Sequence, residues 1–154
     1  MSADTPAVRA VKASGLAHTI VEYGRAASVE EAAGARRVAV DRVIKTIVVR
    51  RGDGDFVMVL VPGDRVIDWS KLRKVLGVSR MSLARPDEAI AATGYRPGTI
   101  TPFGSTTALP VVADASMDGL ASIGGGASGV AINVDAAELI AFLGAEVADV
   151  TKLG

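Results

Sequence analysis

Residues 42–64 read RVIKTIVVRRGDGDFVMVLVPGD, two apolar runs rich in β-branched residues that are joined by Gly52-Asp53-Gly54-Asp55. β-Branched residues favour strands, and glycine alternating with aspartate between two strand-like runs supplies the residues that tight turns require. The stretch therefore predicts a β-hairpin of two long strands.

The segments around this hairpin show further strand and helix signals. SVEEAAGA (28–35) carries a capping box, with Ser28 as N-cap, Glu31 at the third helical position and Gly34 as the expected stop. Gly77 and Gly94 are expected to end two later helices, and Asp135 to begin the last one. The predicted strands are 17–23, 42–51, 56–64, 79–84, 109–114, 120–123, 130–134 and 146–150, and the predicted helices are 5–16, 28–34, 68–77, 85–94 and 135–145.

The resulting order is α-β-α-β-β-α-β-α-loop-β-β-β-α-β. Short turns between consecutive strands favour antiparallel or mixed pairing over a doubly wound parallel sheet. We therefore predict an α+β fold with a mixed, mostly antiparallel, barrel-like sheet and helices packed outside. At 154 residues the chain fits one domain, spanning residues 1–154.

The composition excludes several classes of protein. The sequence contains no cysteine, which excludes disulfides, thiolate nucleophiles and Cys-ligated zinc, and a reducing cytoplasm suits it. Lys+Arg 17 balance Asp+Glu 17, so any contact with a nucleic acid depends on a local patch. The N-terminus lacks the apolar region of a signal peptide, and no run of about 18 apolar residues occurs. We therefore expect a cytoplasmic protein with no membrane segment.

Two motifs resemble ligand sites but have simpler explanations. GGGASG (124–129) fits the G-x-G-x-x-G pattern, yet VAINV follows as a strand, whereas a dinucleotide site needs a helix there. The motif is therefore interpreted either as a hairpin turn or as a backbone-lined hollow between two strands. Asp53 and Asp55 lack the other ligands of a calcium loop and are assigned to a turn. No metal and no cofactor are expected.

Three side chains are candidates for chemistry. Lys45 shares a strand face with Val43, Ile47 and Val49, where a charge is costly. It is an edge-strand residue that blocks sheet-to-sheet pairing, a side chain that buries its stem and extends its charge to water, or a cation at a pocket mouth that holds an anion or polarises a carbonyl. His18 is more easily explained as a solvated or capping residue than as a catalytic one. Tyr23 could be a core ring or a hydroxyl donor.

Residues 93–104 read TGYRPGTITPFG and combine three glycines with two prolines. Proline fixes φ, whereas glycine permits positive φ and close approach to bare backbone. A strand-like run, TALPVVAD, follows at once, so the segment lies inside the domain and is interpreted as a shaped loop rather than a linker.

Taken in series, these features resemble the YbaK and prolyl-tRNA-synthetase-associated editing domains, which are free-standing or inserted hydrolases that clear mischarged aminoacyl-tRNA. The similarity is greatest to the free-standing cysteinyl-tRNA(Pro) deacylase type. The landmarks that carry it are Thr5-Pro6-Ala7-Val8, Ser28 to Ala33, Val43-Ile44-Lys45-Thr46, Thr93-Gly94-Tyr95, Pro97-Gly98, Pro102-Phe103-Gly104, Leu109-Pro110, Asp114 and Gly125-Gly126.

The resemblance implies a pocket for the aminoacylated 3′-adenosine, with mischarged tRNA as substrate and prolyl-tRNA synthetase as a possible partner. It implies that Lys45 and Tyr23 are catalytic, and that water, the ribose hydroxyl or the substrate's own thiol attacks the ester. A non-catalytic module that binds tRNA or synthetase is the alternative. The substrate-binding residues that it implies are Thr46, Gly94, Gly98, Pro102, Gly104, Gly125 and Gly126.

Two positions differ from the pattern of the family. Ala127-Ser128 stand where members carry basic residues, and Ala131 stands where the cysteine-specific type carries an acid. The sequence therefore leaves the amino acid open, with cysteine and alanine as the candidates.

Overall fold

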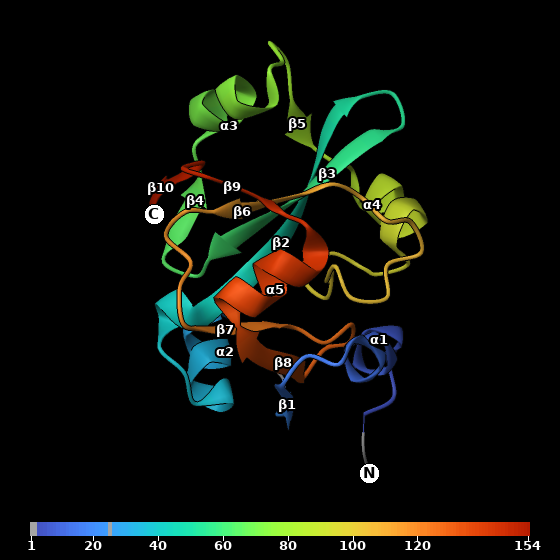
Figure 1. Cartoon of the computed structure of the whole chain (residues 1–154), viewed down its shortest axis with the longest axis vertical. Helices are drawn as coiled ribbons and strands as arrows, with labels where there is room; N and C mark the ends of the chain where they lie inside the picture. Colours follow the sequence, from blue (N-terminus) through green and yellow to red (C-terminus); the bar gives the residue numbers. More distant parts are fainter. Residues whose placement is uncertain (1–2, 25) are drawn as a thin grey trace.

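The computed structural model describes residues 3–24 and 26–154. Figure 1 shows β2 and β3 running through the middle of the molecule, with the helices placed around the strands. The helices are α1 (Pro6–Ser14), α2 (Val29–Arg36), α3 (Trp69–Leu76), α4 (Pro86–Thr93) and α5 (Ala136–Leu143), with a 3₁₀ turn at Val40–Arg42. The strands are β1 (His18–Glu22), β2 (Val43–Gly52), β3 (Asp55–Pro62), β4 (Arg65–Ile67), β5 (Ser82–Leu83), β6 (Val111–Asp114), β7 (Leu120–Gly124), β8 (Val130–Asp135), β9 (Glu146–Ala148) and β10 (Thr151–Leu153).

The predicted hairpin is confirmed. β2 and β3 pair antiparallel from Ile44 opposite Pro62 to Gly52 opposite Asp55, with an irregularity between Arg50 and Gly52. β3 is buried from Val57 to Pro62, as expected for a strand covered on both faces.

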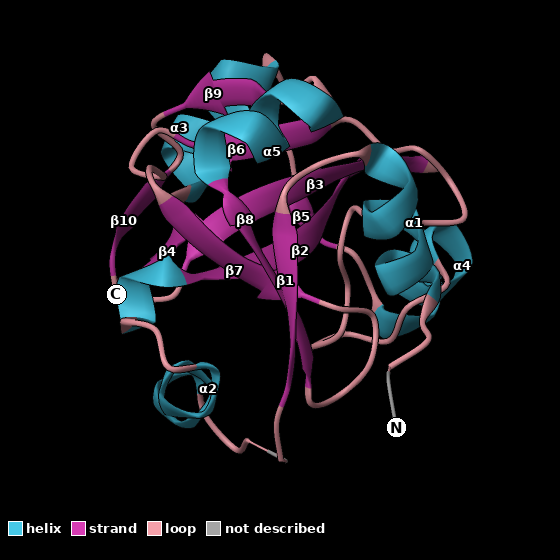
Figure 2. Ribbon diagram, turned by 60° about the horizontal axis from the view of Figure 1, so that its bottom comes forward, coloured by secondary structure: helices cyan, strands magenta, loops and turns pink. Residues whose placement is uncertain are grey.

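The sheet is mixed, as predicted. Its strand order is β1-β8-β7-β2-β3-β6-β9, with β5 attached to β2, and a separate pair joins β10 to β4. The pairs β2–β7, β3–β6 and β6–β9 are parallel, and the remaining pairs are antiparallel. β1 and β9 stand at opposite ends of this order, so the sheet is not closed. Figure 2 shows that the sheet is strongly curved. The α+β class with outer helices is thereby confirmed, without a closed barrel.

Most predicted helix boundaries are confirmed by their caps. The side chains of Ser28 and Asp135 accept hydrogen bonds from the backbone N–H groups three residues later, and Gly77 and Gly94 end their helices with positive φ. The expected stop at Gly34 is wrong. α2 continues to Arg36 and ends at Arg37, where the N–H of Val38 bonds the carbonyl of Ala33.

The C-terminal part also differs from the prediction. The expected single strand 146–150 is interrupted, because Val150 is fully buried and its N–H donates to the carboxylate of Asp114 (3.1 Å) while its carbonyl accepts from Asp68 (2.9 Å). The chain then continues as β10, which pairs with β4. β4 has only three residues, too few for its alternation to be recognised.

Hydrophobic residues pack on both faces of the central hairpin. Ile44, Val48 and Leu60 belong to one buried cluster, and Val49 and Val61 to a second. Between these buried positions, the middle of β2 is only partly covered. This incompletely covered stretch of β2 positions the candidate site.

In residues 3–24 and 26–154 no helix has the length and apolar character that crossing a membrane requires. The same residues contain no cluster of three or more His, Asp and Glu side chains arranged to hold a metal ion.

Candidate active site

A gap in the pairing of β2 creates the site. One edge of β2 pairs with β7 at Val43 and Ile44 and with β5 at Val49 and Arg50. Among the described strands, none pairs with this edge between Ile44 and Val49. β2 lies inside the strand order, although the edge that carries Lys45 is locally unpaired within the described residues.

A cavity of about 460 Å³ lies over this gap. That volume falls within the roughly 300–1,000 Å³ typical of small-molecule sites. Its walls come from the segment that begins α2, from the middle of β2, from the loop after α4 and from the end of β7. The lining residues are Ala26, Ala27, Ser28, Val29, Ala32, Arg36, Val43, Ile44, Lys45, Thr46, Ile47, Gly98, Ile100 and Gly124.

Lys45 is the cation that the sequence singled out, and it lines this cavity. Its Nζ donates a hydrogen bond to the carbonyl of Arg65 at 2.7 Å. Burial lowers the pKa of Lys45 below its ordinary value, and the negative charge of Asp64 partly offsets that effect. An ammonium group has three N–H donors, so Lys45 can bind an oxygen of a ligand without giving up its bond to Arg65.

The end of β7 forms one wall of the cavity. The parallel pairing of β2 with β7 ends at Ile44 and Ile123, and the next residue of each strand, Lys45 and Gly124, lines the cavity. Gly124 in turn pairs with Ala131 on β8. A Cβ on Gly124 would stand 3.3 Å from the carbonyl oxygen of Ile100, so the end of β7 and the loop after α4 approach each other closely at the cavity wall.

Thr46 and Gly98 join the cavity to a second hollow. This groove, of about 360 Å³, is largely apolar and shares Thr46, Ile47, Gly98 and Ile100 with the cavity. The buried hydroxyl oxygen of Thr46 has no hydrogen-bond partner in the part of the chain that the structure describes. Buried polar atoms are normally paired, so the unpaired Thr46 hydroxyl is an unusual feature of this wall.

Tyr23 reaches the site through Arg36. The Tyr23 hydroxyl oxygen accepts hydrogen bonds from Nη2 (3.1 Å) and Nε (3.4 Å) of Arg36, which lines the cavity. Arg36 also donates from Nη1 to the carbonyl of Ser122 at 3.0 Å. Tyr23 therefore contacts the lining residue Arg36 and is not itself among the lining residues.

The loop after α4 is shaped as the sequence indicated. The Tyr95 hydroxyl donates to the carbonyl of Phe103 at 2.7 Å, which ties the two ends of the loop together. Burial raises the pKa of Tyr95, and the charge of Arg9 opposes this shift. The middle of the loop, at Gly98 and Ile100, covers the gap in β2.

The remaining glycines proposed for substrate binding lie at packing contacts. A Cβ on Gly104 would stand 2.6 Å from the backbone of Pro6, and one on Gly126 would stand 2.8 Å from the ring of Tyr95. Gly125 accepts a hydrogen bond from the hydroxyl of Thr5 at 2.6 Å and directly follows the lining residue Gly124. Gly94 caps α4 beside Thr106, and Pro102 precedes Phe103; neither lines the cavity.

The sequence missed part of the site. It gave Arg36 no role beyond a local basic group and gave Ile100 none. It indicated Ser28 to Ala33 only as landmarks and the glycine motif that begins at Gly124 only as a turn or a hollow, although the Ser28 cap, which determines where α2 starts, was readable in advance.

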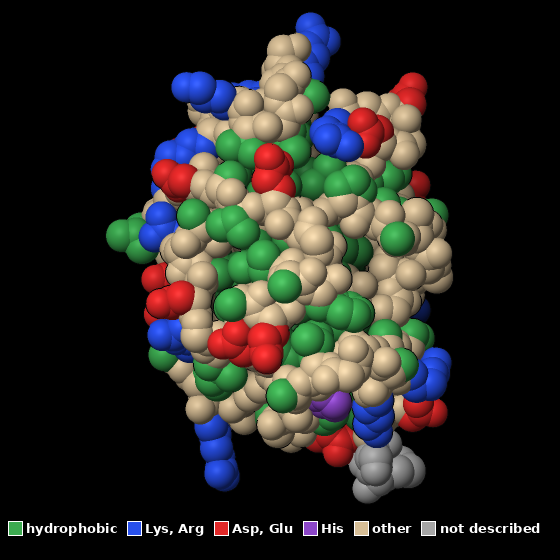
Figure 3. Space-filling view, viewed as in Figure 1, with side chains coloured by type: hydrophobic (Ala, Val, Ile, Leu, Met, Phe, Trp, Pro, Cys, Tyr) green, Lys and Arg blue, Asp and Glu red, His purple; other side chains and the backbone are tan. Residues whose placement is uncertain are grey.

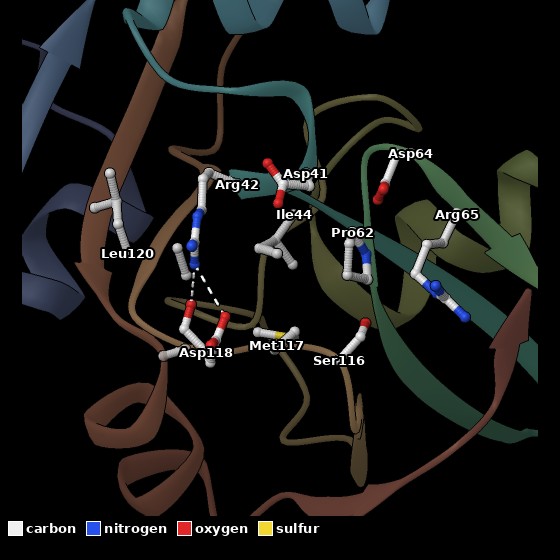
Figure 4. Close-up of a pocket in the computed structure, with 12 residues that line it drawn as sticks. Asp41, Arg42, Ile44, Pro62, Asp64, Arg65, Ser116, Met117, Asp118 and Leu120 are labelled. Atoms are coloured by element: carbon white, nitrogen blue, oxygen red, sulfur yellow. Dashed lines mark hydrogen bonds and ion pairs between the residues drawn. The ribbon is translucent and has the colours of Figure 1, made fainter. Parts of the chain in front are cut away.

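A second cavity adjoins the site but is small. It holds about 80 Å³ and shares Ile44 with the main cavity. Figure 4 shows Arg42 paired with Asp118 at one side of it, and Asp64 and Arg65 at the other. It is smaller than typical small-molecule sites, and it is lined by Asp64, the residue whose charge acts on Lys45.

Asp64→Asn should lower the pKa of Lys45 further, because it removes the negative charge that counteracts burial. An NMR titration of the Lys45 side chain would show its transition at a lower pH than in the wild type. Asp53→Asn is the matched control, since Asp53 is an exposed residue of the β2–β3 turn. An unchanged or raised pKa of Lys45 in Asp64→Asn would contradict the assignment of Asp64 as its counter-charge.

Comparison with known proteins agrees with this geometry. Residues 24–152 match the model of the family described as the aminoacyl-tRNA editing domain. A solved structure described as "a putative trans-editing enzyme for prolyl tRNA synthetase" superimposes with a TM-score of 0.87 and 28% identity, over 98% of this chain and 99% of that one. The chain therefore belongs to the aminoacyl-tRNA editing domain family, and the resemblance seen in the sequence is confirmed.

Two larger proteins are similar to part of the chain. A proline--tRNA ligase of Trichlorobacter lovleyi is 38% identical over 78 residues, which are 51% of this chain and 14% of the ligase. A proline--tRNA ligase of Pelobacter propionicus is 33% identical over 95 residues, which are 62% of this chain and 16% of the ligase. The similarity thus covers only a small part of each ligase.

Proposed function

We propose that this protein is a trans-acting aminoacyl-tRNA deacylase that hydrolyses the ester of tRNA(Pro) mischarged with a small amino acid, alanine or cysteine. The observation that carries the proposal is Lys45, a partly buried cation in a cavity of suitable volume. Membership of the editing family supports the reaction class. The protein would act in the cytoplasm, where mischarged tRNA arises, and prolyl-tRNA synthetase is a candidate partner.

The proposed reaction needs no nucleophile from the protein. Water attacks the ester carbonyl carbon, and negative charge develops on the carbonyl oxygen, where the Lys45 ammonium group stabilises it. The bond to the ribose 3′ oxygen then breaks, and this oxygen takes the proton released by the water. The products are the free amino acid and tRNA with a 3′ hydroxyl. For a cysteinyl ester, the thiol of the substrate could instead attack the carbonyl carbon. The bond to the ribose oxygen then breaks, this oxygen takes the thiol proton, and the cyclic thioester that forms is hydrolysed by water to cysteine.

The neighbouring residues are assigned by their placement. We assign Thr46 and Gly98 to the adenosine or acyl group, because they line the cavity and the adjoining groove. Gly125 and Gly126 support the edge formed by Gly124. Gly94, Pro102 and Gly104 hold the loop in place, so their proposed contact with substrate would be indirect.

The surface favours recognition of the 3′ end over broad electrostatic binding. On the face shown in Figure 3, Lys and Arg side chains lie mainly around the rim, with acidic side chains among them. Several arginines are already in ion pairs, such as Arg50 with Glu88 and Arg51 with Asp55. Binding energy would then come chiefly from the cavity.

Deacylation of Cys-, Ala-, Ser- and Pro-tRNA(Pro) tests the proposal under one set of conditions. We expect alanine or cysteine to be released at least tenfold faster than proline, because backbone at Gly98 and Gly124 lines the cavity closely and leaves little volume for a side chain. Faster loss of proline than of both alanine and cysteine would rule out an editing role. Tight binding of all four without turnover would favour the alternative, a non-catalytic module that binds tRNA or synthetase.

A further inference from the structure

Arg36 makes more contacts with the site than any role so far explains. Its guanidinium carbon lies 5.4 Å from the centroid of the Tyr23 ring, and its N–H groups reach both the Tyr23 hydroxyl and the Ser122 carbonyl. These contacts connect the end of α2, the residue that follows β1, and β7. One side chain thus fixes three segments at the wall of the cavity.

The direction of the hydrogen bonds at Tyr23 is determined by chemistry. A guanidinium group has five N–H donors and no acceptor, so the Tyr23 oxygen must be the acceptor in both contacts. Its own O–H cannot donate to Arg36. Among the described residues, the Tyr23 hydroxyl donates no hydrogen bond to another protein group, so its proton can be donated to an acceptor outside the protein.

The Ser122 contact keeps Arg36 in place. Ser122 is fully buried, and its carbonyl lies in the pairing of β7 between β2 and β8. A hydrogen bond from Nη1 to this rigid carbonyl, with Nε and Nη2 on Tyr23, holds the planar guanidinium in one orientation. Lysine has a single nitrogen and cannot reproduce this three-point geometry.

We propose that Arg36 is a positioning residue that makes the Tyr23 hydroxyl a hydrogen-bond donor to an oxygen of the 3′-aminoacyl-adenosine. Two Arg36 N–H groups occupy the acceptor side of the hydroxyl, so its proton points away from the guanidinium and toward the ligand. The inference rests on the proposed function for the identity of the ligand. It assigns Arg36 an effect that is exerted through Tyr23.

A double-mutant cycle tests this coupling. Arg36→Met, Tyr23→Phe and the double variant are compared for kcat and KM on Ala-tRNA(Pro), and for the Kd of an alanyl-adenosine in which an amide replaces the ester. We expect each single variant to lose about tenfold in kcat/KM or in affinity, the size of one hydrogen bond. The double variant should lose no more kcat/KM or affinity than Tyr23→Phe does. Arg36→Lys should recover only part of the kcat/KM or affinity that Arg36→Met loses.

Matched controls separate coupling from folding. Arg37→Met removes the neighbouring exposed arginine at the end of α2 and should leave kcat, KM and Kd unchanged. Thermal unfolding of every variant shows whether the fold is retained. If the losses of the two single variants multiply in the double variant, Arg36 acts independently of Tyr23 and the inference is wrong. The inference is equally wrong if Arg36→Met binds and turns over like the wild type.

The readouts also separate this inference from the proposed function. If the wild type binds the amide analogue but hydrolyses no ester, the deacylase proposal is overturned. The double-mutant cycle, measured by the Kd of the analogue, would still test the positioning role of Arg36. A wild type that fails to bind the analogue would overturn the inference. Hydrolysis with multiplicative losses would leave the deacylase proposal intact and remove only the positioning role.

Discussion

Lys45→Met should lower kcat for deacylation by about 10²–10³-fold, the cost of removing one stabilising group from a developing oxyanion. Methionine retains the length of the aliphatic stem but carries no charge. Lys45 is partly buried and its pKa is lowered, so it opposes folding in its charged form. Replacing Lys45 with methionine removes this unfavourable charge and so stabilises the fold. Losing the hydrogen bond to Arg65 costs about 0.5–1.5 kcal/mol, which partly cancels that stabilisation.

The free energy of unfolding of Lys45→Met should therefore stay within about 1 kcal/mol of the wild type. Single-turnover deacylation of Ala-tRNA(Pro) together with urea unfolding measures both effects. Lys12→Met, on an exposed lysine of α1, is the control and should match the wild type in both. Unchanged activity with increased stability would mean that Lys45 has no part in the chemistry.

Gly104→Ala should destabilise the protein by about 2–4 kcal/mol, from strain and overpacking together. Gly104 has φ +70°, a conformation that alanine adopts only at a cost, and its new Cβ would stand 2.6 Å from the backbone of Pro6. The Tyr95 hydroxyl, which closes the loop, lies 2.9 Å from the same position. Thermal or urea unfolding measures the loss.

Gly98→Ala is the matched comparison. Gly98 also has positive φ, at +89°, but no heavy atom lies within 4 Å of the added Cβ. It should be less destabilising than Gly104→Ala, and because Gly98 lines the cavity it should raise KM for Ala-tRNA(Pro). A Gly104→Ala variant that unfolds like the wild type but has lost deacylation would instead place Gly104 in contact with the substrate.

The sequence by itself determined the local elements. The β2–β3 hairpin, the caps at Ser28 and Asp135 and the helix ends at Gly77 and Gly94 all depend on residues within a few positions of one another. Such short-range chemistry is readable in order along the chain. A lysine in an apolar strand face was likewise visible without coordinates, because its cost follows from alternation alone.

Only the tertiary structure decided what surrounds Lys45. The parallel pairing of β2 with β7, the gap before β5 and the contact of Arg36 with Tyr23 all join segments distant in the sequence. The structure also separated Gly98, which lines the cavity, from Gly104, which packs on α1. Local propensity is the same for both glycines. Which backbone faces a neighbour and which faces a hollow depends on how the strands pack together, and that arrangement is determined by burial over the whole chain.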